Sequence, residues 1–312
     1  MKLSMIVPCY NEAENVVSFQ TSVMDAFATC GYEYEIVYVD DGSTDATFHN
    51  LKKLHRMQDC NVKVIRLSRN FGKESGIYAG LNHVSGDYIA IIDADLQQSP
   101  ALLRNMVDIL DKEANYDVVA AYQENRKECK PLAFFKKVFY GLMNHASDLK
   151  FKAHASDFRV FRRSVADSIL QLQECHRFSK GLFSWVGFET YYIPYTPERR
   201  KSGKSKWGVG KLTNYAIDGI IGYSTKPLRI ATCLGGLTAV AAILYLISVI
   251  LEKLIAGIDV PGYATIIVLI LFLGSMQLFC IGIIGEYVGR TFEQSKNRPI
   301  YIEKEILTYE DK

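Results

Sequence analysis

Three groups of polar side chains in the N-terminal part of the chain each stand where a short apolar run ends. These groups are Pro8-Cys9-Tyr10-Asn11-Glu12, Asp40-Asp41-Gly42-Ser43 and Asp93-Ala94-Asp95-Leu96-Gln97. Asp93 and Asp95 are two residues apart, so both carboxylates can reach one hard cation such as Mg²⁺ or Mn²⁺, which is commonly shared with the phosphates of a substrate. Aspartates that only cap a loop are the alternative, but the position of the pair after an apolar run favours metal binding.

The elements that must position these groups alternate between strand and helix. Short β-branched or apolar runs at residues 3–8, 35–39, 62–67, 88–92 and 117–121 predict strands. Between the first two runs, an apolar residue every three or four positions predicts a helix with one buried face. This alternation predicts an α/β fold with a mostly parallel sheet that is flanked by helices on both faces. Such sheets bind ligands beyond the carboxyl ends of their strands, where the three polar groups would meet.

Composition argues against several classes of protein. The chain has 312 residues with 36 Lys and Arg against 34 Asp and Glu, and a net charge of +2 gives no reason to expect binding to nucleic acid. No GxGxxG or GxxxxGKS/T pattern supports a dinucleotide fold or a P-loop. The scattered cysteines form no CxxC pair, so they fit neither a disulfide framework nor a zinc site and indicate thiols in a reducing compartment.

Two long apolar runs without a charged residue lie toward the C-terminal end, at residues 230–251 and 262–285. Each meets the requirement of about 20 residues for a helix that crosses the hydrocarbon core of a membrane. Buried core helices are the alternative, but two such runs joined by a short loop favour a transmembrane hairpin. Small residues such as Gly235 and Gly282 allow close helix contacts within the hairpin or between subunits, so a homo-oligomer stays an open alternative.

The charges that flank the two runs predict their orientation. Lys226 and Arg229 precede the first run, and Arg290, Lys296 and Arg298 follow the second. Because cytoplasmic flanks carry the excess of Lys and Arg, we expect both termini in the cytoplasm. The expected divisions are a cytoplasmic domain at residues 1–228, two transmembrane helices within 229–289 and a cytoplasmic tail at 290–312.

Two further segments, residues 131–149 and 211–224, are predicted to be amphipathic helices at the surface of the lipid bilayer. In the first segment, apolar residues recur at helical spacing with Lys136 and Lys137 beside them. An ordinary helix that packs on the soluble part is the alternative for this segment.

Several motifs in a fixed order make the chain resemble glycosyltransferase family 2. The motifs are Pro8-x-Tyr10-Asn11-Glu12, Val39-Asp40-Asp41-Gly42-Ser43-Thr44-Asp45, Asn70-Phe71-Gly72-Lys73 and Asp93-Ala94-Asp95-Leu96-Gln97. Downstream, Asp157-Phe158-Arg159, His176-Arg177-Phe178 and Arg200-x-x-Gly203-x-Ser205-Lys206 are similar to its polyprenyl-phosphate branch. That branch includes dolichyl-phosphate mannose synthases and bactoprenol glucosyltransferases, and the terminal hairpin most resembles the latter.

This resemblance implies a GT-A fold for the catalytic domain and a nucleotide-sugar donor. It implies donor-binding roles for Pro8, Tyr10, Glu12, Asp40 and Asp93. It also implies that Asp95, Gln97 and Asp93 hold Mg²⁺ or Mn²⁺ on the diphosphate of the donor. One departure is that many relatives continue the last motif with Asp-Pro, where this chain has Gln98-Ser99-Pro100.

The expected acceptor is a lipid phosphate, which must approach an anionic donor. Two like charges about 4 Å apart repel by around 4 kcal/mol at an effective dielectric constant near 20. The basic segment at residues 199–206 can compensate this repulsion, and Arg200, Lys204 and Lys206 are its candidate ligands for the acceptor phosphate. A solvated basic loop, or one attracted to anionic lipids, is the alternative.

The candidate catalytic residues are Asp157, Arg200 and Lys206. Asp157 would orient or deprotonate the acceptor, or else cap its own loop. Taken together, the sequence and the resemblance favour an inverting transfer of one hexose, glucose from UDP-glucose, to undecaprenyl phosphate at the cytoplasmic face of the bacterial inner membrane. The same reaction with GDP-mannose or another nucleotide sugar is one alternative. A non-catalytic scaffold that binds nucleotide sugar and assists a flippase is an alternative of another class.

Overall fold

The chain divides into an α/β unit and a hairpin unit. A computed structural model describes residues 1–57, 61–123, 155–197, 219, 221–222, 224–256 and 262–308. The α/β unit comprises Met1–Asn144, Leu149–Leu212 and Arg298–Lys312, and the hairpin unit comprises His145–Asp148 and Thr213–Asn297. The α/β unit therefore contains chain from both sides of the hairpin.

Within the described residues, eight strands of the α/β unit form one mixed sheet in the order β7-β5-β6-β4-β1-β2-β3-β8. The strands are β1 (Lys2–Cys9), β2 (Glu33–Asp40), β3 (Val62–Leu67), β4 (Tyr88–Ile91), β5 (Val118–Gln123), β6 (Ala155–Arg162), β7 (Thr190–Tyr195) and β8 (Glu303–Leu307). The strands β3, β2, β1 and β4 run parallel to one another, whereas β6 runs antiparallel between β4 and β5. The mostly parallel sheet predicted from the sequence is confirmed, and all five predicted strands are present.

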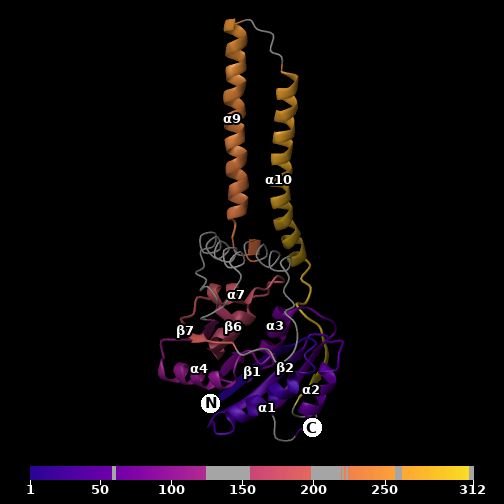
Figure 1. Cartoon of the computed structure of the whole chain (residues 1–312), viewed down its shortest axis with the longest axis vertical. Coiled ribbons are helices and arrows are strands. Elements are labelled where there is room, and N and C mark those ends of the chain that lie inside the picture. Colours follow the sequence, from indigo (N-terminus) through magenta and orange to yellow (C-terminus); the bar gives the residue numbers. More distant parts are fainter. Residues whose placement is uncertain are drawn as a thin grey trace. The chain divides into compact units, whose positions relative to one another are not determined.

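Helices cover both faces of this sheet (Figure 1). They are α1 (Val16–Phe27), α2 (Thr47–His55), α3 (Lys73–His83), α4 (Ala101–Lys112), α6 (Arg163–Leu170) and α7 (Ser179–Trp185). Side chains of a strand alternate between the two faces. Met5 of β1 therefore belongs to the hydrophobic core that includes residues of α1, α2 and α4, while its neighbour Ile6 belongs to the core that includes residues of α3, α6 and α7. Since β1 is buried on both faces, it is apolar along almost its whole length.

The strand β8 follows the hairpin and completes the far edge of the sheet. It pairs antiparallel with β3, and Ser68 donates its backbone N–H to the Ile302 carbonyl at 2.9 Å. Ile306 packs against one hydrophobic core and Leu307 against the other. The segment expected as a tail at residues 290–312 therefore supplies a strand of the α/β unit.

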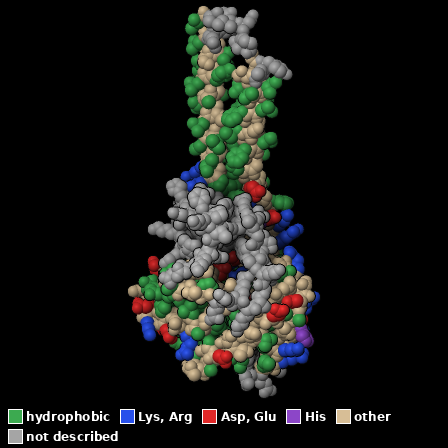
Figure 2. Space-filling view, in the orientation of Figure 1, with side chains coloured by type: hydrophobic (Ala, Val, Ile, Leu, Met, Phe, Trp, Pro, Cys, Tyr) green, Lys and Arg blue, Asp and Glu red, His purple; other side chains and the backbone are tan. Residues whose placement is uncertain are grey.

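The hairpin unit consists of two long helices, α9 (Lys226–Ala256) and α10 (Tyr263–Ser295). Both are long and apolar enough to cross a membrane, and their hydrophobic side chains lie exposed along their length (Figure 2). The Tyr287 hydroxyl donates to the Ser224 carbonyl at 2.6 Å and so ties α10 to the start of α9. The expected hairpin is confirmed. The predicted helix at residues 131–149 and most of the one at 211–224 lie outside the described residues.

Candidate active site

A cavity of about 290 Å³ lies at the carboxyl ends of β1, β2 and β4. It is lined by Pro8, Cys9, Tyr10, Glu12, Asp41, Asn70, Gly72, Lys73, Asp93, Ala94 and Asp95. The sheet therefore brings the three polar groups of the sequence to one place, because the strands that carry them are parallel and adjacent.

Two loops of the cavity are joined through Asp41. Its carboxylate accepts the backbone N–H groups of Phe71 and Gly72 at 2.7 and 2.8 Å. Burial raises the pKa of Asp41, and these two donors offset part of that effect. Gly42 has a φ of +64°, and a Cβ there would lie 2.4 Å from the carbonyl carbon of Arg69. Only glycine permits so close an approach, so the Asp-Asp-Gly-Ser motif and the Asn-Phe-Gly-Lys motif depend on each other.

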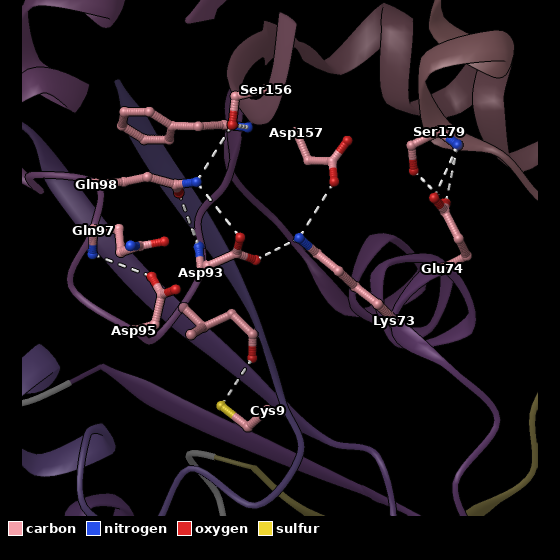
Figure 3. A network of polar contacts seen from close by, with 12 residues as sticks. Cys9, Lys73, Glu74, Asp93, Asp95, Gln97, Gln98, Ser156, Asp157 and Ser179 are labelled. Atoms are coloured by element: carbon pink, nitrogen blue, oxygen red, sulfur yellow. Dashed lines mark hydrogen bonds and ion pairs between the residues drawn. The ribbon is translucent and has the colours of Figure 1, made fainter. Parts of the chain in front are cut away.

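Lys73, the first residue of α3, holds two carboxylates from neighbouring strands (Figure 3). Its Nζ lies 2.6 Å from Asp93 Oδ1 beyond β4 and 3.3 Å from Asp157 Oδ2 on β6. Burial lowers the pKa of the Lys73 amine, but the Asp93 and Asp157 charges outweigh it and raise the pKa above its ordinary value. In the sequence, Lys73 stood out only as part of a motif.

Asp157 is held as an anion. Burial raises the pKa of its carboxyl, but the charges of Lys73, Lys180 and Arg159 prevail and hold the pKa well below its usual range. Its Oδ1 is buried and has no hydrogen-bond partner within the described residues. The structure thus brings Asp157 and Asp93 to the same lysine, Lys73.

Gln98 links the end of β4 to the start of β6, a role that was not predicted from the sequence. Its Oε1 accepts the backbone N–H of Asp93 at 3.1 Å, and its Nε2 lies 3.5 Å from Asp93 Oδ2 and 3.4 Å from Ser156 Oγ. The side chain is only 5% exposed. The only signal in the sequence was that a glutamine stands where many relatives have an acidic residue.

Glu74 anchors the start of α7 from the residue next to Lys73. Its carboxylate accepts the backbone N–H of Ser179 at 3.0 Å from Oε2 and also accepts the Ser179 hydroxyl. Burial raises the pKa of Glu74, the nearby Asp157 charge adds to this, and the Ser179 donors offset part of it. The first turn of α3 therefore connects β4, β6 and α7 around the cavity.

Three predicted site residues that the structure describes do not line the cavity, namely Asp40, Gln97 and Asp157. Asp40 at the end of β2 is fully buried, accepts the Ser43 backbone N–H at 3.1 Å and pairs with Arg66 at 3.5 Å. Burial raises its pKa despite these two partners. Gln97 donates its backbone N–H to Asp95 Oδ1 at 3.1 Å and so lies directly beside a lining residue. The predicted phosphate ligands Arg200, Lys204 and Lys206 lie outside the described residues.

The oxygen atoms of Asp93, Asp95 and Gln97 are the donor type that Mg²⁺ or Mn²⁺ requires. Within the described part of the chain, no three His, Cys, Asp or Glu side chains form a group that could hold a metal ion by themselves. The residues therefore fit a cation whose remaining ligands come from a substrate phosphate and water.

Comparison with known proteins identifies the family. The model of Glycosyl transferase family 2 matches residues 4–170, and that of the GtrB C-terminal hairpin matches residues 226–291. The chain is 39% identical to the bactoprenol glucosyl transferase of Shigella phage SfV, over 97% of this chain and 98% of the relative. It is 38% identical to the prophage bactoprenol glucosyl transferase homolog of Escherichia coli, over 98% of this chain and 99% of the relative.

A solved structure, glucosyl-3-phosphoglycerate synthase from Mycobacterium tuberculosis, aligns with a TM-score of 0.47 and 18% identity over 70% of this chain and 78% of that one. The resemblance inferred from the ordered motifs is confirmed by the two family matches, which together cover the α/β core and the hairpin. The chain belongs to glycosyl transferase family 2 and carries the GtrB C-terminal hairpin.

Proposed function

We propose that this protein transfers one hexose, glucose from UDP-glucose, to undecaprenyl phosphate with inversion at the anomeric carbon. The observation that carries the proposal is the match to bactoprenol glucosyl transferases over nearly the whole chain, hairpin included. The cavity at the strand ends supports it, because the family motifs converge there. Transfer of one sugar in a single in-line displacement would invert the configuration.

The donor would bind in the cavity. Pro8, Tyr10, Glu12 and Asp93 line it and would contact the nucleotide sugar. Asp40 is fully buried, so it would not contact the donor directly but would hold the loop that contains Ser43. A divalent cation held by Asp95, Gln97 and Asp93 would offset the charge that builds on the diphosphate leaving group as the glycosidic bond breaks.

The acceptor needs little help from a general base. A phosphate monoester has a second pKa near 6, so the attacking oxygen is largely ionised at neutral pH. Asp157, whose pKa is held well below its usual range, is a weak base at neutral pH. We therefore assign Asp157 the role of a fixed anion that orients groups at the acceptor side. Arg200, Lys204 and Lys206 would bind the acceptor phosphate.

We propose that the hairpin spans the bacterial inner membrane twice, with the α/β unit and both termini in the cytoplasm. The α/β unit contains chain from before and after the hairpin, which requires an even number of crossings. Lys226 and Arg229 lie near the start of α9 and Arg290 lies near the end of α10. These cations support a cytoplasmic location for both of these helix ends. A reactive cysteine placed in the loop between the helices should be labelled from outside intact spheroplasts, whereas labelling only after lysis contradicts this orientation.

The function is tested with the purified full-length protein in detergent, undecaprenyl phosphate and radiolabelled nucleotide sugars. We expect Mg²⁺- or Mn²⁺-dependent formation of a glucolipid from UDP-glucose, and its loss when EDTA is added. Transfer from GDP-mannose but not from UDP-glucose would show that the donor is GDP-mannose and not UDP-glucose. Binding of nucleotide sugar without transfer to any polyprenyl phosphate would favour the scaffold and overturn the enzymatic function.

A further inference from the structure

The Asp93 carboxylate already has a cationic partner in the protein. We propose that Lys73 is a positioning residue that competes with the divalent cation for Asp93, so that the metal enters together with the donor diphosphate and not before it. This inference rests on the proposed function, because it concerns the metal-dependent donor site. It assigns a role to a side chain that the reaction scheme above does not use.

Contacts on both oxygens of Asp93 support this competition. Lys73 Nζ lies 2.6 Å from Oδ1, which is the distance of a direct ion pair. Gln98 Nε2 lies 3.5 Å from Oδ2 (Figure 3). A cation that takes Asp93 as a ligand must therefore displace Lys73 or accept a positive charge as a close neighbour.

The charge balance of the cavity leads to the same conclusion. Its lining includes four carboxylates, from Glu12, Asp41, Asp93 and Asp95, and Lys73 is the one cationic side chain among the described lining residues. Lys73 thus lowers the negative potential that would attract a divalent cation to the cavity before the donor binds. A nucleoside diphosphate adds negative charge, so it restores the negative potential that Lys73 weakens. Its phosphate oxygens also supply metal ligands that the described residues do not provide.

Lys73 can leave Asp93 without losing its last partner. Asp157 Oδ2 lies 3.3 Å from the same Nζ, so one carboxylate remains when the metal takes the other. The backbone at this point is held by the next residue, because Glu74 binds Ser179 at the start of α7. The ammonium group can therefore shift between two anions while its helix stays in place.

The test measures Mn²⁺ binding to the full-length protein in detergent, using the electron paramagnetic resonance signal of free Mn²⁺. Without nucleotide, Lys73→Met should bind Mn²⁺ at least tenfold more tightly than wild type, and Lys73→Arg should stay within about threefold of wild type. With saturating UDP, the difference between Lys73→Met and wild type should shrink below about threefold. Unchanged or weaker binding by a folded Lys73→Met protein overturns the inference.

Lys180→Met is the matched control, since Lys180 acts on Asp157 by charge but has no ion pair with Asp93. Its Mn²⁺ affinity should stay within about twofold of wild type. If it tightens as much as Lys73→Met, net charge explains the effect and the pairing proposal is wrong. Asp157→Asn serves where Lys73→Met does not fold. It leaves Lys73 with Asp93 alone and should weaken Mn²⁺ binding, so tighter binding contradicts the proposal.

The outcome is separable from that of the proposed function. Tighter Mn²⁺ binding by Lys73→Met with no sugar transfer by wild type would retain this inference and reject the glucosyltransferase. Sugar transfer by wild type, together with an unchanged Mn²⁺ affinity in Lys73→Met, would retain the glucosyltransferase function and reject this inference.

Discussion

Gly42→Ala tests the close approach between the two loops that line the cavity. Gly42 has a φ of +64°, a left-handed conformation that costs a residue with a Cβ about 1–2 kcal/mol. The added Cβ would also lie 2.4 Å from the Arg69 carbonyl carbon and 2.7 Å from the Asn70 nitrogen. Because both contacts are with backbone, no side-chain rotation relieves them and the loop at residues 69–72 must move.

The movement has a further cost. The displaced loop carries the N–H groups of Phe71 and Gly72, which donate to the buried Asp41. Weakening these bonds to a buried carboxylate costs about 1–3 kcal/mol. We therefore expect Gly42→Ala to lower the free energy of unfolding by about 2–5 kcal/mol in total. This corresponds to roughly 4–20 °C in Tm for a domain of this size.

Gly187→Ala is the control, since Gly187 has a similar φ of +73° but a Cβ added there would lie 4.0 Å from its nearest neighbour, the Trp185 carbonyl oxygen. Its free energy of unfolding should fall only by the cost of the left-handed backbone conformation, about 1–2 kcal/mol. Thermal unfolding by circular dichroism gives the stabilities, and calorimetry with UDP gives donor affinity, which should fall at least tenfold in Gly42→Ala alone. Equal Tm values for the two variants would refute the reasoning.

Three further outcomes are expected. Burial raises the folded-state pKa of Glu74, so its ionisation destabilises the fold as the pH rises above about 4.3. The Tm of Glu74→Gln relative to wild type should therefore be higher near pH 8 than near pH 5, and a difference in Tm that does not depend on pH contradicts this. Because the pKa of Asp157 is held low, profiles of kcat/KM against pH for wild type and Asp157→Asn should run parallel between pH 5 and 8. An acidic limb in that range that disappears in Asp157→Asn would show that Asp157 acts as a base. Ending the chain after α10 removes the packing of Ile306 and Leu307 and should destabilise the α/β unit by about 2–4 kcal/mol. Limited proteolysis measures this loss, and unchanged protection would show that β8 is dispensable.

Local patterns were enough to predict the elements and the edge at which the site forms. The five predicted strands and the first helix follow from the spacing of apolar residues, which decides the side that an element buries. The cluster at Asp93 and Asp95 was correctly expected beside the group at Tyr10, because parallel neighbouring strands end at the same edge. The hairpin followed from length and lack of charge alone.

Contacts between distant residues depended on the order of strands, which no local pattern contains. Lys73 meets Asp157 only because β6 inserts antiparallel beside β4, 84 positions along the chain from the lysine. The strand β8 joins β3 after the whole hairpin, and its short sequence with three charged residues gave no signal of this pairing. Such pairings depend on the free energy of the complete sheet. Each strand must hydrogen-bond to the edge of its neighbour and also pack against the hydrophobic layers on both faces of the sheet. The tertiary structure alone therefore decided which charges of the site neutralise one another.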